Sequence, residues 1–394
     1  TFAGGLATTG GGTNPGTVNV AGTVNTTDTQ MDLGAVTLTA AVTLDTGNAA
    51  AGILNVGAVT SGGNALTLDS GSTGGATMNL TSMVAGAGGL TIRDAGGAVT
   101  IGDVGSSSAG AVTITDSTAG VTFSANLDAT TLTITDTEDS ASVTFADGQD
   151  VDLTTGLTVS NAGSDAYNVV INSSTFDAAG ATTFANSGTL TLGNAATDAV
   201  VFEGGLTATA PAVTLAGNVQ ANGAAISLGS STKAITLAGT TAILDSTKSG
   251  ATGTGANITI DGAVDGTADN TQSLTLNAGT AGAISFTANA PVSGGSNDLA
   301  TLTITQSNGA TFGAAVEAET SVVLTDTENS QNITFNGDLT TATLTTTGNT
   351  YNLLLNENVT VTADTTFAAI GNLTIGTGTD DVATFTGGLD TVTN

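Results

Sequence analysis

The sequence predicts an all-β fold, a parallel β-helix (β-solenoid) with coils of about 20–22 residues and little or no helix. A motif of alternating apolar and polar residues that ends in Asp recurs at steps of 22 and 20 residues, in segments 90–94, 112–116 and 132–136. A second alternating strand follows each copy at steps of 22 residues, starting at Val99, Val121 and Val143. Alternation indicates strands with one buried face, and a short period of such strands is typical of a solenoid.

The rest of the chain carries further short alternating segments, most of them bounded by Gly, Asn, Asp or Ser, residues typical of turns. In the first half they are residues 17–20, 35–38, 42–44, 52–56 and 65–68, and in the second half 225–228, 234–237, 257–260 and 273–276. Apolar residues nowhere recur at the spacing of three and four that marks a helix. We therefore expect strands and turns throughout.

A longer repeat lies above the coil period. The only two tyrosines, Tyr167 and Tyr351, begin similar six-residue segments, and several other motifs recur at nearly the same offset. We predict two copies of one solenoid, residues 1–200 and 201–394, in a continuous rod. A stretch of Gly, Ser and Thr near 246–256 is expected to be a flexible insertion.

Composition limits both the core and the function. With 55 Gly, 11 Phe, 2 Tyr and no Trp, the core must be thin and consist of Val, Leu, Ile and Ala. The three cations Arg93, Lys233 and Lys248 face 33 carboxylates, for a net charge of −30, which argues against a nucleic-acid partner and membrane insertion. Without His or Cys the commonest catalytic bases and nucleophiles are missing, so we predict no catalytic residues and no enzyme.

Carboxylates at strand ends are the candidate metal ligands. Asp94, Asp116 and Asp136 end the three copies of the first motif, and Glu138 and Asp139 follow the third. Coils in register would stack the three aspartates about 4.8 Å apart, where like charges repel unless they are bridged by a cation, and calcium prefers such oxygen ligands.

The alternative for the same positions is structural. Aspartate at a strand end readily accepts a hydrogen bond from its own turn, so each carboxylate could simply close a corner. The acids after Glu138 are also compatible with a solvated loop. Both interpretations remain open, and the sequence requires no cofactor other than this calcium.

The Leu-Thr-Ile and Val-Thr-Phe strands, punctuated by Gly, Asn and Asp in an acidic chain without Cys, resemble repeat regions of large secreted bacterial surface proteins. The nearest families are the β-helical passenger regions of autotransporters and filamentous-haemagglutinin-type adhesins, and S-layer proteins share the composition. The resemblance implies an extracellular or cell-surface location in a prokaryote.

Two functions follow from these patterns. The first is a structural filament or surface fibre that grows as a head-to-tail homopolymer, because the segment 2–6 resembles the segment 385–389. The second is a surface adhesin or S-layer module that binds a host, matrix, cell-surface or glycan ligand, which could instead consist of tandem Ig-like sandwiches. Sandwiches would require antiparallel pairing, so the fold distinguishes that architecture.

Overall fold

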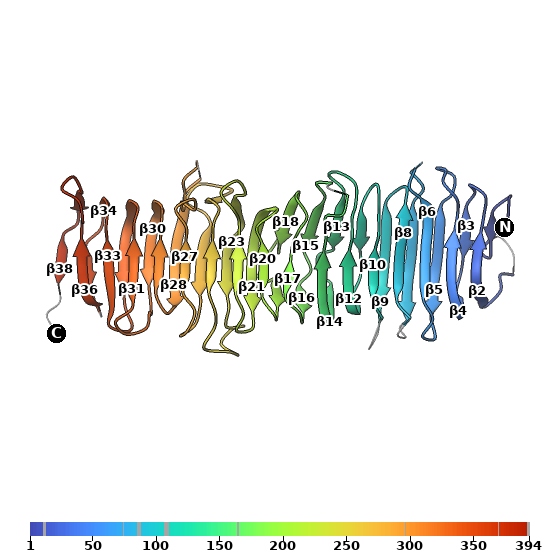
Figure 1. The fold of residues 1–394 in the computed structure, drawn as a ribbon, viewed down its shortest axis with the longest axis horizontal. Helices are drawn as coiled ribbons and strands as arrows, with labels where there is room; N and C mark the ends of the chain where they lie inside the picture. Colours follow the sequence, from blue (N-terminus) through green and yellow to red (C-terminus); the bar gives the residue numbers. More distant parts are fainter. Residues whose placement is uncertain are drawn as a thin grey trace. The chain divides into compact units, whose positions relative to one another are not determined.

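The computed structural model describes residues 1–10, 13–73, 75–84, 88–105, 110–163, 165–295, 297–368 and 370–391. These residues form parallel β-solenoid with about 16 turns in all, and none of them is helical (Figure 1). The predicted fold class is confirmed. The turns average about 23 residues, slightly more than predicted, because the motifs that set the predicted step lie in the tightest coils while others carry longer corner loops.

The chain divides into two compact units, Thr1–Leu190 and Thr191–Asn394. In the first unit, one series of parallel strands contains β1 (Leu6–Ala7), β3 (Met31–Leu33), β5 (Leu54–Thr60), β7 (Met78–Val84), β9 (Val99–Val104), β11 (Val121–Phe123), β13 (Ser142–Phe145) and β15 (Asn168–Ile171). A second series contains β2 (Val18–Asn25), β4 (Val36–Asp45), β6 (Leu66–Gly71), β8 (Leu90–Ala95), β10 (Val112–Ile114), β12 (Leu127–Ile134), β14 (Asp150–Val159) and β16 (Thr175–Ala178), followed in the chain by β17 (Thr182–Thr183) and β18 (Thr189–Leu192).

The second unit repeats this organisation. One series contains β20 (Leu206–Ala208), β22 (Ile226–Leu228), β24 (Ile258–Ile260), β27 (Ile284–Phe286), β29 (Ala310–Phe312), β31 (Asn332–Phe335), β33 (Tyr351–Leu355) and β36 (Ile370–Ile375). The other contains β19 (Ala199–Phe202), β21 (Ala212–Ala221), β23 (Ile235–Asp245), β25 (Val264–Gly266), β26 (Ser273–Asn277), β28 (Leu299–Gln306), β30 (Val316–Leu324), β32 (Leu339–Thr346), β34 (Val359–Val361) and β37 (Ala383–Phe385). A separate pair joins β35 (Thr365–Phe367) to β38 (Leu389–Thr391).

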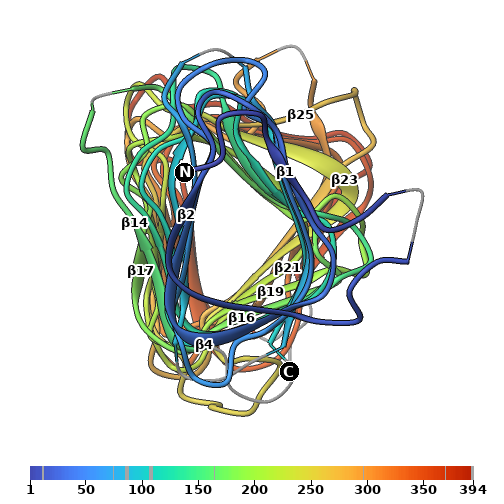
Figure 2. The same ribbon diagram turned by 90° about the vertical axis from the view of Figure 1, so that its right-hand side faces the viewer.

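The strand pairing within each unit is parallel, and strands that bend at a bulge contribute to two sides of the coil (Figure 2). Two isolated antiparallel bridges, Asn222 to Thr247 and Ser230 to Lys233, lie at corners. Antiparallel Ig-like sandwiches are therefore excluded for the described residues, and that version of the adhesin alternative is wrong.

The interior consists of columns of identical or similar apolar residues. Val112 pairs in register with Leu90 on one side and Leu132 on the other, and all three are at most 1% exposed. Phe123 stacks on Phe145 with ring centroids 5.2 Å apart and the planes within 6° of each other. The predicted columns are confirmed, because stacking each coil on an identical neighbour is what buries such a thin apolar face.

Buried hydroxyl groups close the corners. The residues after the strand-end aspartates point inward, and Thr46, Ser70, Ser117 and Thr137 are fully buried. The hydroxyl groups of Ser70 and Ser117 donate to the carbonyl oxygens of Ala76 and Gly120 at 3.2 and 3.1 Å. These bonds fix the corner that carries the aspartates.

The segment expected to be an insertion, residues 246–256, leaves the coil directly after β23. The Asp245 carboxylate accepts backbone N–H bonds from Thr247 and Ser249, both at 2.8 Å, and the Ser246 hydroxyl donates to the Ala256 carbonyl at 2.8 Å. The two ends of the loop are thus held together at its base.

Candidate acidic metal sites

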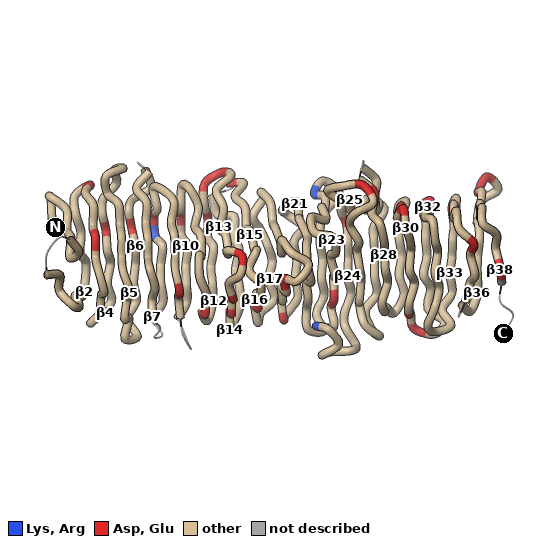
Figure 3. Tube along the Cα trace, turned by 180° about the vertical axis from the view of Figure 1, so that it is seen from behind, with Lys and Arg blue, Asp and Glu red and all other residues tan. Residues whose placement is uncertain are grey.

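Acidic residues recur from coil to coil in both units (Figure 3). In the first unit, strand-end aspartates of the second series form a column that we call the aspartate ladder: Asp45, Asp69, Asp94, Asp116 and Asp136. Asp45 pairs in register with Asp69, and Asp69 with Asp94. Partial burial and the neighbouring charges of Asp69 and Asp116 raise the pKa of Asp94 above its ordinary value. The sequence predicted this column of like charges, and its cost is visible in that pKa.

Part of the ladder carries its own cation. The register shifts between Leu68 and Asp69, so that Arg93 is an extra residue opposite the ladder. Its guanidinium binds the Asp69 carboxylate, with Nε 2.6 Å from Oδ2, while Asp69 is only 6% exposed. A β-bulge of this kind commonly redirects a side chain, and here it places one positive charge among three aspartates.

The turn alternative holds for two rungs of the ladder. Asp45 accepts the backbone N–H of Gly47 at 2.9 Å, and Asp69 accepts that of Gly71 at 2.8 Å. Asp94 and Asp116 receive no such bond from the residues that the structure describes. Calcium at Asp94, Asp116 and Asp136 therefore stays a prediction.

The other predicted ligands lie next to the end of the ladder. Asp136 accepts the N–H of Thr137 at 3.0 Å, and Asp139 accepts the N–H of Ala166 from the following coil at 2.6 Å. Glu138 is exposed. Asp165, which the sequence did not single out, joins them: the charges of Asp136 and Asp139, together with desolvation, raise its pKa.

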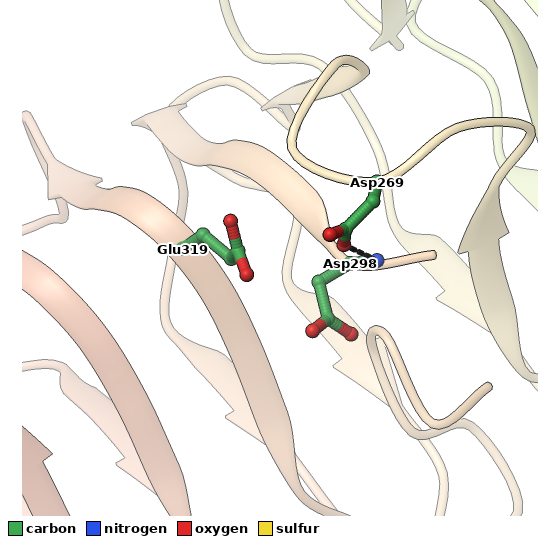
Figure 4. Close-up of side chains that lie close together, drawn as sticks. All are labelled: Asp269, Asp298 and Glu319. Atoms are coloured by element: carbon green, nitrogen blue, oxygen red, sulfur yellow. Dashed lines mark hydrogen bonds between the residues drawn. The ribbon is translucent and has the colours of Figure 1, made fainter. Parts of the chain in front are cut away.

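A second group, which we call the acidic cluster, lies in the second unit. Asp269 follows β25, Asp298 directly precedes β28, and Glu319 lies within β30; one carboxylate oxygen of each lies within 4.8 Å of the others (Figure 4). The backbone N–H of Asp298 donates to Asp269 Oδ1 at 3.2 Å, which fixes the two loops against each other. Among the described residues this is the group of carboxylates that meets the geometry of a cation site.

Electrostatics reflect this convergence. Burial, then the charges of Asp269 and Asp265, raise the pKa of Asp298, and burial together with Asp298 and Glu319 raises that of Glu317. Three carboxylates can supply about half of the six to eight oxygen ligands that calcium takes, the remainder coming from water. The sequence gave no signal for this cluster, because its members come from three successive coils and only two follow a loop.

The residue inventory limits other chemistry, since the sequence contains no His and no Cys. No helix spans a membrane in the described part of the chain, which contains no helix at all. The chain matches no protein-family model, no curated protein and no solved structure.

Proposed function

We propose that the chain is a structural protein that forms an extracellular filament or cell-surface fibre by end-to-end stacking of solenoid coils. The supporting observation is the position of the exposed large apolar side chains. Of five such residues in the described chain, Phe2 lies beside β1, whereas Ile375, Val382 and Leu389 belong to the last strands of their series. Apolar residues are therefore exposed where a coil has no neighbour.

The strand edges at these positions fit the same purpose. β1 pairs only with β3, and β37 and β38 pair only with β34 and β35. An unpaired parallel edge is a template for another strand, and head-to-tail contacts that do not close produce filaments. We propose a second copy of this chain as the partner.

The extracellular part of the proposal rests on composition. Three Lys and Arg residues leave trypsin-like proteases few cleavage sites, and a net charge of −30 keeps fibres apart in solution. With the resemblance in strand pattern, we place the chain among surface proteins comparable to adhesin passengers or S-layers, with a structural and non-catalytic role.

Assembly can be tested with the purified polypeptide of residues 1–394, by sedimentation velocity over a concentration series and by negative-stain microscopy. We expect fibres that Val382→Lys or Leu389→Lys abolishes, because a lysine would bury an unpaired charge in the joint. Val84→Lys is the matched control, since Val84 is 49% exposed but lies in β7, which has neighbours on both sides. A monomer at every concentration, or equal loss in the control, would overturn the proposal.

A further inference from the structure

A polar groove lies on the outer face of β3, β5 and β7 in the first unit. Its volume is about 350 Å³, and the lining residues that matter for recognition are Thr9, Asp32, Gly34, Asn55, Asn79 and Thr81. A second hollow of about 260 Å³ shares Asp32 and adds Gln30 and the backbone of Gly4 and Gly5. The first volume lies at the small end of the range of ligand sites.

Side chains in the groove form one directed hydrogen-bond chain. Asp32, Asn55 and Asn79 occupy matching positions of successive coils. Asn55 Nδ2 donates to Asp32 Oδ1 at 2.6 Å, and Asn79 Nδ2 donates to Asn55 Oδ1 at 2.8 Å. Because an ionised carboxylate only accepts, Asp32 fixes the orientation of both amides. Gln30 Nε2 donates to the other oxygen of Asp32 at 2.7 Å, which holds the carboxylate in place.

This arrangement leaves a defined set of hydrogen-bonding groups toward the solvent. Each amide keeps one N–H, Asn79 keeps its carbonyl oxygen, and Asp32 keeps further lone pairs. The hydroxyl groups of Thr9 and Thr81 line the same groove. Gly34 and Gly57 leave room beside them: a Cβ on Gly57 would lie 2.7 Å from the carbonyl oxygen of Gly34.

The chemistry of the lining selects the class of ligand. None of the three cations lines the groove and Asp32 is acidic, so anionic ligands are disfavoured. The side chains offer almost no apolar surface and no aromatic ring, so an apolar ligand gains little. Donors and acceptors that alternate along the coils suit a ligand with many hydroxyl groups.

We propose that this groove binds a neutral carbohydrate chain. Ligand hydroxyl groups would donate to Asp32 and to the Asn79 carbonyl, and would accept from the free N–H groups of Asn55 and Asn79. Because binding uses hydrogen bonds without stacking, we expect a dissociation constant of about 1 mM.

The competing explanation is that the amides only stabilise the stacked coils. A second ladder provides the comparison: in the second unit, Asn352 donates to Asn332 and Asn372 donates to Asn352, both at 2.9 Å, and this ladder lines neither hollow. Loss of an amide from either ladder should cost similar stability, but only the groove ladder should affect sugar binding.

The experiment is saturation-transfer difference NMR on the 394-residue chain with cellohexaose, maltohexaose and mannohexaose as probes. We expect signal from at least one of the three sugars. Asn55→Ala should weaken its binding at least tenfold, and Thr81→Trp, which fills the groove without touching the ladder, should abolish it. Asn352→Ala should leave binding unchanged, and the melting temperature of each variant shows that it is folded.

Three results would overturn the proposal. They are the absence of transfer to all three sugars, undiminished binding by folded Thr81→Trp, or an equal loss in Asn55→Ala and Asn352→Ala. A ligand that responds to Asp32→Asn but is a simple amine such as spermidine, with no sugar bound, would show that the groove recognises charge instead.

Discussion

The aspartate ladder of the first unit and the acidic cluster of the second unit hold like charges in different ways. In the ladder, Asp94 faces its neighbours along the coil direction, so each carboxylate meets the next at about the strand spacing of 4.8 Å. In the cluster, Asp269, Asp298 and Glu319 converge from two loops and a strand until their oxygens lie within 4.8 Å of one another.

The difference shows what a repeat can and cannot build. Exact repetition places identical groups in a row, where each has two neighbours but no common centre, and the chain relieves the repulsion with Arg93. Convergence on one point needs unequal coils, because a loop must carry a carboxylate back over the coil next to it. A cation site is therefore expected where the repeat is broken.

The largest test concerns Arg93. Arg93→Ala leaves Asp69 nearly buried between two aspartates, so we expect the free energy of unfolding to fall by about 2–3 kcal/mol, below the range for fully buried pairs because the arginine side chain is 45% exposed. Urea denaturation at low salt measures it. Adding Asp69→Asn should recover much of the loss, because the uncompensated charge is then gone.

Lys248→Ala is the matched control. Lys248 binds Glu203, and these side chains are 30% and 22% exposed, whereas that of Asp69 is 8% exposed. We expect a cost of about 1 kcal/mol or less for this more solvated pair. An equal cost for the two substitutions would mean that the position of Arg93 in the ladder has no special importance.

The ladder could be predicted from sequence, and the reason is local. Segments 90–94, 112–116 and 132–136 repeat at nearly constant steps, so register alone stacks Asp94, Asp116 and Asp136. What the pattern did not reveal is the role of Arg93. It reads as one more outward residue of its strand, and only the register shift at the bulge turns it toward Asp69.

The acidic cluster and the groove could not be predicted for a related reason. Both depend on the paths of corner segments, the loop that carries Asp269 and the segment that carries Thr9, and those paths follow no period. Asp32, Asn55 and Asn79 do share a register position, but their spacing of more than one coil length along the sequence is hidden by unequal loops. Interior columns are predictable because burial imposes a pattern; surface sites in irregular corners are not.

Calcium should separate the two regions next. We expect calcium at millimolar excess to raise the free energy of unfolding by about 1.5–2.5 kcal/mol, the linkage for a ligand at ten to a hundred times a dissociation constant of about 10⁻⁴–10⁻³ M. Asp298→Asn should remove this gain, and Asp116→Asn should leave it intact. The reverse pattern would favour the ladder as the calcium site, and no response in the wild type would leave both regions without calcium.

The smallest effect is the pH dependence, and it tests both regions together. Asp94 and Asp298 have folded-state pKa values above their ordinary value near 3.8. The folded protein therefore binds protons more readily than the unfolded chain between the two pKa values, so stability decreases as pH rises through that interval. Above it, each ionised carboxylate is destabilising.

Asp94→Asn and Asp298→Asn should consequently each stabilise the protein at pH 7, by about 0.5 kcal/mol, and the gain should vanish near pH 3 to 4, where the wild-type carboxyl groups are protonated. Denaturation curves at a series of pH values measure this directly. Calcium then sharpens the comparison. With the ion present, Asp298→Asn should become destabilising at pH 7 because a ligand is lost, whereas Asp94→Asn should keep its stabilising effect. If both variants respond to calcium in the same way, the ladder and the cluster do not differ in cation binding, and the distinction between rows and convergent sites fails for this protein.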